Sequence, residues 1–192
     1  MKHMKRIMIA ALCLPLFWVT GCKSIPSYAE DYANARQTTT GKMMNDADAL
    51  EIGQRFTAAF NQLGTDQFID QVSQLYADRL FINDTLSQFS AKENLVEHFK
   101  GMNNRVSNTE VTLLNTAYAQ DSAYVHWRMA YDFKIFGQTR SMMSHGMSEI
   151  KVNDQNQIIF QQDFWDPADG LYRSLPYMKG VYAWLLPFKK SQ

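Results

Sequence analysis

Asp163 is the residue of this chain best suited to acid–base chemistry. Polar and apolar residues alternate over residues 157–166, which predicts a strand with Gln161, Asp163 and Trp165 on one face. If that face lines a water-poor cavity, burial raises the pKa of the carboxyl group toward neutrality, as general acid–base catalysis requires. Two other roles suit the same residue: a polar contact to a bound ligand, or a hydrogen bond that only fixes the structure.

His145 and Asp84 are the candidate partners of Asp163 in such chemistry. His145 lies in a strand predicted over residues 139–152 and could pair with Asp163 if it faces inward, although an ordinary sheet histidine is the alternative. Asp84 directly follows a short strand predicted over residues 79–83, where a general base could lie, but the position equally suits a turn. The catalytic candidates are therefore Asp163, His145 and Asp84.

The remaining histidines do not indicate a metal site. His98 is expected at the surface of a helix and His126 on the outer face of a sheet. No two histidines have the spacing of metal ligands, and the only cysteines are Cys13 and Cys22. We therefore expect neither a metal nor another cofactor.

The N-terminus has the three parts of a bacterial secretion signal. A positively charged start precedes an apolar stretch over residues 7–19. That stretch is shorter than the roughly 20 residues that a membrane-spanning helix needs. The tetrad VTGC then ends at Cys22 and resembles the lipobox of bacterial lipoproteins, whose cysteine carries acyl chains such as palmitate. Residues 1–21 are thus predicted to be a signal peptide, and Cys22 the lipid-bearing first residue of the mature protein.

Lipidation of Cys22 would place the protein in the cell envelope. Lys23 follows the cysteine where inner-membrane lipoproteins of enterobacteria have aspartate, so by analogy we expect the periplasmic face of the outer membrane. The signal peptide contains three of the 19 basic residues and none of the 19 acidic ones, which leaves a net charge of −3. This balance gives nucleic-acid binding no electrostatic support. The polar residues 22–45 are predicted to form a flexible tether.

Residues 46–166 are predicted to form one α+β domain. Helical spacing begins near Asp48, with Glu51 placed as a capping-box partner, and Ser90 with Glu93 predicts a second capping box for a later helix. A change to period two then predicts strands near 109–119, 122–135, 139–152 and 157–166. About three N-terminal helices should therefore pack on a strongly curved, mostly antiparallel sheet.

This order of elements and the closing segment QIIFQQDFWD resemble the SnoaL-like domains of the nuclear transport factor 2-like superfamily, whose closing strand typically reads GKI…xDYxD. The superfamily includes ketosteroid isomerase and limonene epoxide hydrolase, and the resemblance covers roughly residues 46–170. It implies a cone-shaped fold with a deep apolar pocket. The residues expected to bind a ligand there are Trp127, Met129, Tyr131, Asp163 and Trp165.

The resemblance implies an acid–base role for Asp163, but the families' catalytic sets are incomplete. Trp127 and Met129 stand where limonene epoxide hydrolase has an Arg-x-Asp pair. The first helix has Phe56 and Phe60 and no tyrosine for the oxyanion hole of ketosteroid isomerase. We therefore favour a non-catalytic pocket for a small apolar or amphipathic ligand, a lipid included. The alternatives are an isomerase, cyclase or hydrolase that uses Asp163, and a structural module that forms a homodimer through its sheet.

Residues 167–192 form an aromatic-rich, amphipathic C-terminal segment. Pro167 suits the start of a helix. Aromatic residues beside lysines are compatible with an interfacial segment that touches a membrane. The alternative is a tail that closes the cone or packs in a dimer, because an apolar patch of this size must be covered.

Overall fold

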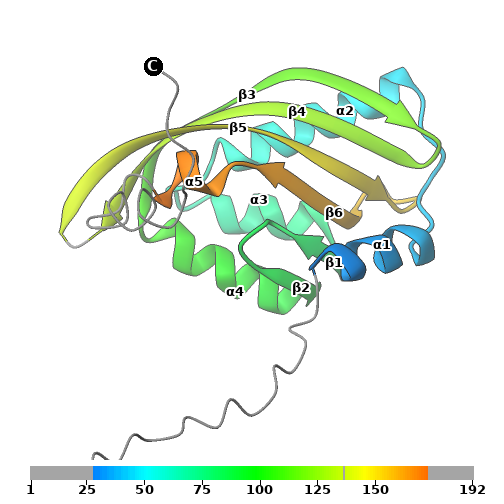
Figure 1. Ribbon diagram of the computed structural model, residues 1–192, viewed down its shortest axis with the longest axis horizontal. Coiled ribbons are helices and arrows are strands. Elements are labelled where there is room, and N and C mark those ends of the chain that lie inside the picture. The colour runs from blue at the N-terminus through cyan, green and yellow to red at the C-terminus, as the bar shows by residue number, and fades with distance from the viewer. Residues whose placement is uncertain (1–27, 136, 173–192) are drawn as a thin grey trace, which may run out of the picture.

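The computed structural model describes residues 28–135 and 137–172 and shows an α+β fold (Figure 1). The elements are α1 (Tyr28–Thr38), α2 (Asp46–Phe60), α3 (Phe68–Leu75), β1 (Tyr76–Asn83), β2 (Gln88–Ala91), α4 (Lys92–Asn103), β3 (Val106–Ala119), β4 (Ser122–Ile135), β5 (Gln138–Val152), β6 (Ile158–Trp165) and α5 (Pro167–Gly170). The predicted fold class is confirmed, and four helices, α1 to α4, precede the long strands where about three were predicted.

The six strands form one sheet in the order β2-β1-β6-β5-β4-β3. All neighbours pair antiparallel except β1 and β6, which are parallel. The long strands β3, β4 and β5 arch over the helices, so that the sheet has a concave and a convex face (Figure 1). The alternation of side chains along a strand then decides which residues face the helices and which face away.

The core lies between the concave face and helices α2, α3 and α4. Phe60 of α2 makes edge-to-face contacts with Phe68 and Phe99, at ring-centroid distances of 5.8 and 5.6 Å. Val125 of β4 and Ile150 of β5 are completely buried against this cluster. Aromatic packing of this kind fixes how far the helices stand from the sheet.

The helix starts differ from the predicted capping boxes. Asn45 caps α2, and its side chain and that of Asp48 form the reciprocal capping box. Helix α4 begins after Ala91 without a side-chain cap, because Ser90 belongs to strand β2. The capping boxes predicted from Asp48 with Glu51 and from Ser90 with Glu93 are therefore wrong. A short edge strand such as β2 carries too few residues for its pattern to be recognised.

Helix α1 replaces much of the flexible tether that we predicted over residues 22–45. It lies on the convex face, where Tyr32 and Arg36 donate hydrogen bonds of 2.7 and 2.8 Å to the two carboxylate oxygens of Glu149. Lys151 donates bonds of 2.8 and 2.7 Å to the carbonyl oxygens of Arg36 and Thr39 at the C-terminal end of the helix. None of the residues of α1 is buried, so its polar sequence gave no sign of this docking.

Candidate functional site

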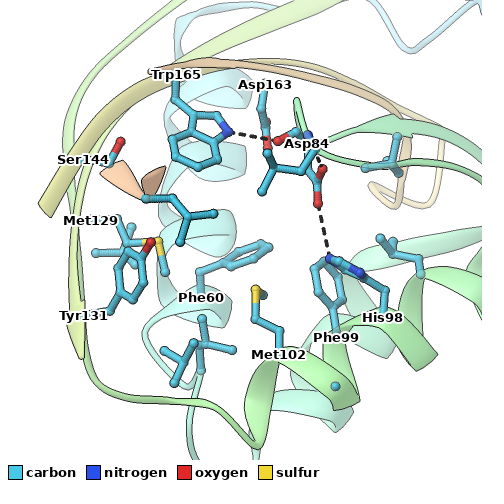
Figure 2. Close-up of a pocket in the computed structure, with 18 of the residues that line it drawn as sticks. Phe60, Asp84, His98, Phe99, Met102, Met129, Tyr131, Ser144, Asp163 and Trp165 are labelled. Atoms are coloured by element: carbon cyan, nitrogen blue, oxygen red, sulfur yellow. Dashed lines mark hydrogen bonds and ion pairs between the residues drawn. The ribbon is translucent and has the colours of Figure 1, made fainter. Parts of the chain in front are cut away.

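The concave face, α2 and α4 enclose a pocket of about 520 Å3 (Figure 2). Its walls are mostly apolar and include seven aromatic side chains: Phe56, Phe60, Phe99, Trp127, Tyr131, Phe133 and Trp165. Helix α5 lies at one end, where the hydroxyl group of Tyr131 donates a 3.2 Å hydrogen bond to the carbonyl oxygen of Gly170. The volume and the walls suit a small organic molecule.

Asp163 stands in this wall at the centre of a chain of hydrogen bonds. The register of β5 and β6 places Ser148 opposite Asp163, and the serine hydroxyl donates a 2.6 Å bond to Asp163 Oδ1. Gln161 Nε2 donates to both carboxylate oxygens, at 2.9 and 3.1 Å. Trp127 Nε1 donates to Ser148 Oγ at 2.9 Å, and the hydroxyl group of Tyr76 donates to Gln161 Oε1 at 2.7 Å. The hydrogen bonds of this network thus all run toward the carboxyl group of Asp163.

Burial raises the pKa of Asp163 to about 7, against the hydrogen bonds from Ser148 and Gln161, which lower it. The nearby charge of Asp84 adds a smaller increase to this pKa. Desolvation penalises the charged carboxylate, whereas donors that point at it favour it. A carboxyl group balanced in this way exchanges its proton near neutral pH.

Asp84 lies at the same end of the pocket and faces His98 (Figure 2). Its Oδ1 accepts hydrogen bonds of 2.9 and 2.6 Å from the backbone N–H groups of Leu86 and Ser87, so the predicted turn role is present. Its Oδ2 lies 3.3 Å from Nε2 of His98 on α4. His98 therefore lines the pocket with a side chain that is 32% exposed, so its predicted position at the helix surface is only partly correct.

His145 lies on the opposite face of the sheet from Asp163. It is exposed on the convex side, opposite Arg128 in the register, whereas its neighbours Ser144 and Gly146 face the pocket side. A pair between His145 and Asp163 is therefore wrong, because successive residues of a strand point to opposite faces.

The structure places Trp127, Met129, Tyr131 and Trp165 on the pocket wall, as expected from the alternation of β4 and β6. Their role in ligand binding stays a prediction. The Trp165 indole donates a 2.9 Å bond to the carbonyl oxygen of Asp84, which fixes the ring at the polar end of the pocket.

Sequence reasoning missed three contributors to the site: Ser148, Gly146 and His98. A Cβ atom added at Gly146 would overlap the ring of Trp127, so only glycine leaves room for this indole. The period-two pattern of β5 places Ser148 and Gly146 on one face, and a strand pairing with β6 would have linked Ser148 to Asp163. No comparable local signal identifies His98.

Helix α5 begins at Pro167, as predicted, and Leu171 lines the pocket beyond it. The rest of the C-terminal segment lies outside the described residues, as does Cys22, so both predictions stay untested. Within residues 28–135 and 137–172 there is no cluster of three side chains that could hold a metal ion. No helix in this part of the chain is long and apolar enough to cross a membrane.

The family model of the SnoaL-like domain matches residues 54–160, which include helices α3 and α4, strands β1 to β5 and most of the pocket wall, and which end before Gln161, Asp163 and Trp165. The chain belongs to the SnoaL-like domain family. Searching the curated proteins gave no match to the chain.

Solved structures place the domain in the nuclear transport factor 2-like fold group. TsrD from Streptomyces laurentii is 16% identical, with a TM-score of 0.54 over 68% of this chain and 96% of its own. An LEH-like epoxide hydrolase from M. tuberculosis is 17% identical, with a TM-score of 0.51 over 74% of this chain and 98% of its own. A protein from Jannaschia sp. CCS1 assigned to the SnoaL-like polyketide cyclases is 14% identical, with a TM-score of 0.52 over 69% and 99%. Identities this low show a shared fold.

Proposed function

We propose that this SnoaL-like domain binds one small, mainly apolar molecule in the pocket and contacts its polar group through Asp163. The observation that carries the proposal is a single carboxyl group held by Ser148 and Gln161 in the wall of an otherwise largely apolar cavity. Apolar walls supply affinity, and a few well-placed polar groups supply orientation.

Calorimetric titration of the full-length chain with octan-1-ol tests this function. We expect saturable binding that is lost in Met129→Trp, because the larger ring fills space beside the pocket wall. Met143→Trp is the matched control, since Met143 is 55% exposed on the convex face. Equal binding to wild type and Met129→Trp would overturn the proposal.

A proton-transfer enzyme is the second candidate, favoured by the pKa of about 7 at Asp163. Isomerases, cyclases and epoxide hydrolases of this fold group need an acid or base at a pocket wall. Tyr131 is a phenol in the pocket, but its hydroxyl group is bonded to Gly170, so the oxyanion stabiliser stays unassigned.

Exchange of hydrogen for deuterium next to the carbonyl group of a small apolar ketone separates the two candidates. In heavy water, an enzyme with Asp163 as the base exchanges these protons, and Asp163→Asn does not, although the ketone still binds. Binding of the ketone without exchange by the wild-type chain would leave the binding function and exclude this proton transfer.

Membrane attachment through Cys22 remains part of the proposed function. If the cysteine is lipidated, only residues 23–27 separate it from the start of α1. The domain then lies close to the membrane, which makes a membrane-derived ligand more accessible than it would be to a free protein. Labelling of cells with a palmitate analogue should mark the wild-type protein and not Cys22→Ser.

A further inference from the structure

Asp163 is a partly buried carboxyl group of the pocket wall and has no cation beside it. Among the described residues, none of the ion pairs includes Asp163, and its neighbours Ser148 and Gln161 are neutral. Buried carboxylates are normally paired with a positive charge. The missing charge is therefore one that a ligand could supply.

The other charged groups of the pocket do not supply it. His98 is directed at Asp84, at 3.3 Å. Arg105 and Glu97 also line the pocket, but both are exposed to solvent. Inside the cavity, the two carboxyl groups of Asp84 and Asp163 thus outnumber the single histidine. Such a pocket disfavours a carboxylate or phosphate ligand.

Two indole rings accompany Asp163 at this end. Trp165 lies two residues further along the same face of β6, and Trp127 is linked to Asp163 through Ser148. Tryptophan is the side chain that attracts organic cations most strongly through its π face. A carboxylate in a mostly apolar wall with two tryptophan side chains beside it is a combination that favours an ammonium group.

We propose that the polar group accepted by this pocket is an organic cation, a protonated or quaternary amine, bound at Asp163 beside Trp127 and Trp165. This inference rests on the proposed binding function and names the class of its ligand. The opposite wall, with Phe60, Phe99 and Met102, receives the apolar part of the molecule (Figure 2).

Three ligands with one tail and different heads test the inference: octyltrimethylammonium, octan-1-ol and octanoate. In calorimetric titrations of the full-length chain, we expect the cation to bind at least about tenfold more tightly than the alcohol. Octanoate should bind most weakly. In Asp163→Asn the preference of cation over alcohol should fall to near unity while the alcohol still binds, which shows that the fold is intact.

Asp78→Asn is the matched control, because it removes a carboxylate that is 85% exposed and does not line the pocket. It should change the affinity for the cation by less than about twofold. Equal affinities of wild type for the cation and the alcohol, or a preference for octanoate, would overturn the inference and leave the apolar binding function standing. If none of the three binds, the binding function itself fails.

Discussion

Two carboxylates of the sheet occupy adjacent register positions but opposite faces, and their surroundings differ completely. Glu149 pairs with Gln162, and Ser148 pairs with Asp163, in the ladder of β5 and β6. Glu149 points to the convex face, is 1% exposed and is bound by Arg36, Tyr32 and Ser122. Asp163 points into the pocket and is bound by neutral donors alone.

This difference indicates a different role for each carboxylate. Arg36 supplies Glu149 with a charge and a hydrogen bond of 2.8 Å, so this group is complete without any ligand and holds α1 on the sheet. Burial and the bond to Glu149 raise the pKa of Tyr32 to about 12, which keeps its hydroxyl group a donor at neutral pH. Asp163 lacks such a charge, and burial raises its pKa instead. A carboxylate with its own cation is structural, whereas one without a cation beside a cavity suits function.

The largest expected effect comes from removing the cation of the ion pair between Arg36 and Glu149. Arg36→Met should lower the free energy of unfolding by about 2 to 3 kcal/mol, because it leaves Glu149 buried without a cation. The value lies at the low end for buried pairs, since the Arg36 side chain is 45% exposed. Chemical denaturation followed by circular dichroism measures it. Lys100→Met, at an exposed pair with Glu97, should cost less than about 1 kcal/mol; equal losses would contradict a structural role for Glu149.

Asp163 should make the free energy of unfolding depend on pH. Its folded-state pKa of about 7 lies above the ordinary value for an aspartate, so folding favours the protonated form. The stabilisation is fully present below about pH 4 and is lost as the pH rises through 7. From about pH 5 to 8, the free energy of unfolding of the wild type should fall by about 2 to 3 kcal/mol more than that of Asp163→Asn. Parallel curves for the two proteins would show that Asp163 is not desolvated in the empty pocket.

The faces of the long strands were predictable because alternation is local. Strand β4 has the predicted limits, and β6 differs by one residue at each end, so Trp127, Met129 and Asp163 could be placed on one wall. The docking of α1 could not be predicted, because Arg36 and Glu149 are 113 residues apart in the chain. Nothing near either residue indicates the other.

The histidines show the same limit. His145 is one residue from Ser144, so its face depended on the register of β5, which the sequence left open. His98 meets Asp84 only because the turn after β1 and the helix α4 come together in space. Contacts between a turn and a helix surface have no period in the sequence, and the candidate site was predictable where strands build it.

A change in the shape of the pocket wall at Trp127 tests whether the ligand contacts this ring. Gly146→Ala should weaken the binding of octan-1-ol about tenfold, because the added methyl group pushes the Trp127 ring out of its place. Gly101→Ala is the matched control: Gly101 also lies at the pocket edge, but no atom lies within 4 Å of its added Cβ, so the methyl group displaces no side chain. It lies in α4 and should stabilise the protein by roughly 0.5 to 1 kcal/mol without loss of binding. Similar affinities in the two variants would argue against ligand contact at Trp127.

The smallest expected effect is the change in the pKa of Asp163 when the negative charge of Asp84 is removed. The main cause of the raised pKa of Asp163 is burial, and the negative charge of Asp84 adds only a minor part. Asp84→Asn should therefore lower the pKa of Asp163 slightly, because it removes this negative charge. The turn should keep its shape, since the asparagine oxygen still accepts the bonds from Leu86 and Ser87. Titration of the Asp163 carboxyl carbon by NMR measures the change. A fall of this pKa to the ordinary value for aspartate would mean that repulsion between the carboxylates, and not the missing cation in an apolar wall, controls Asp163.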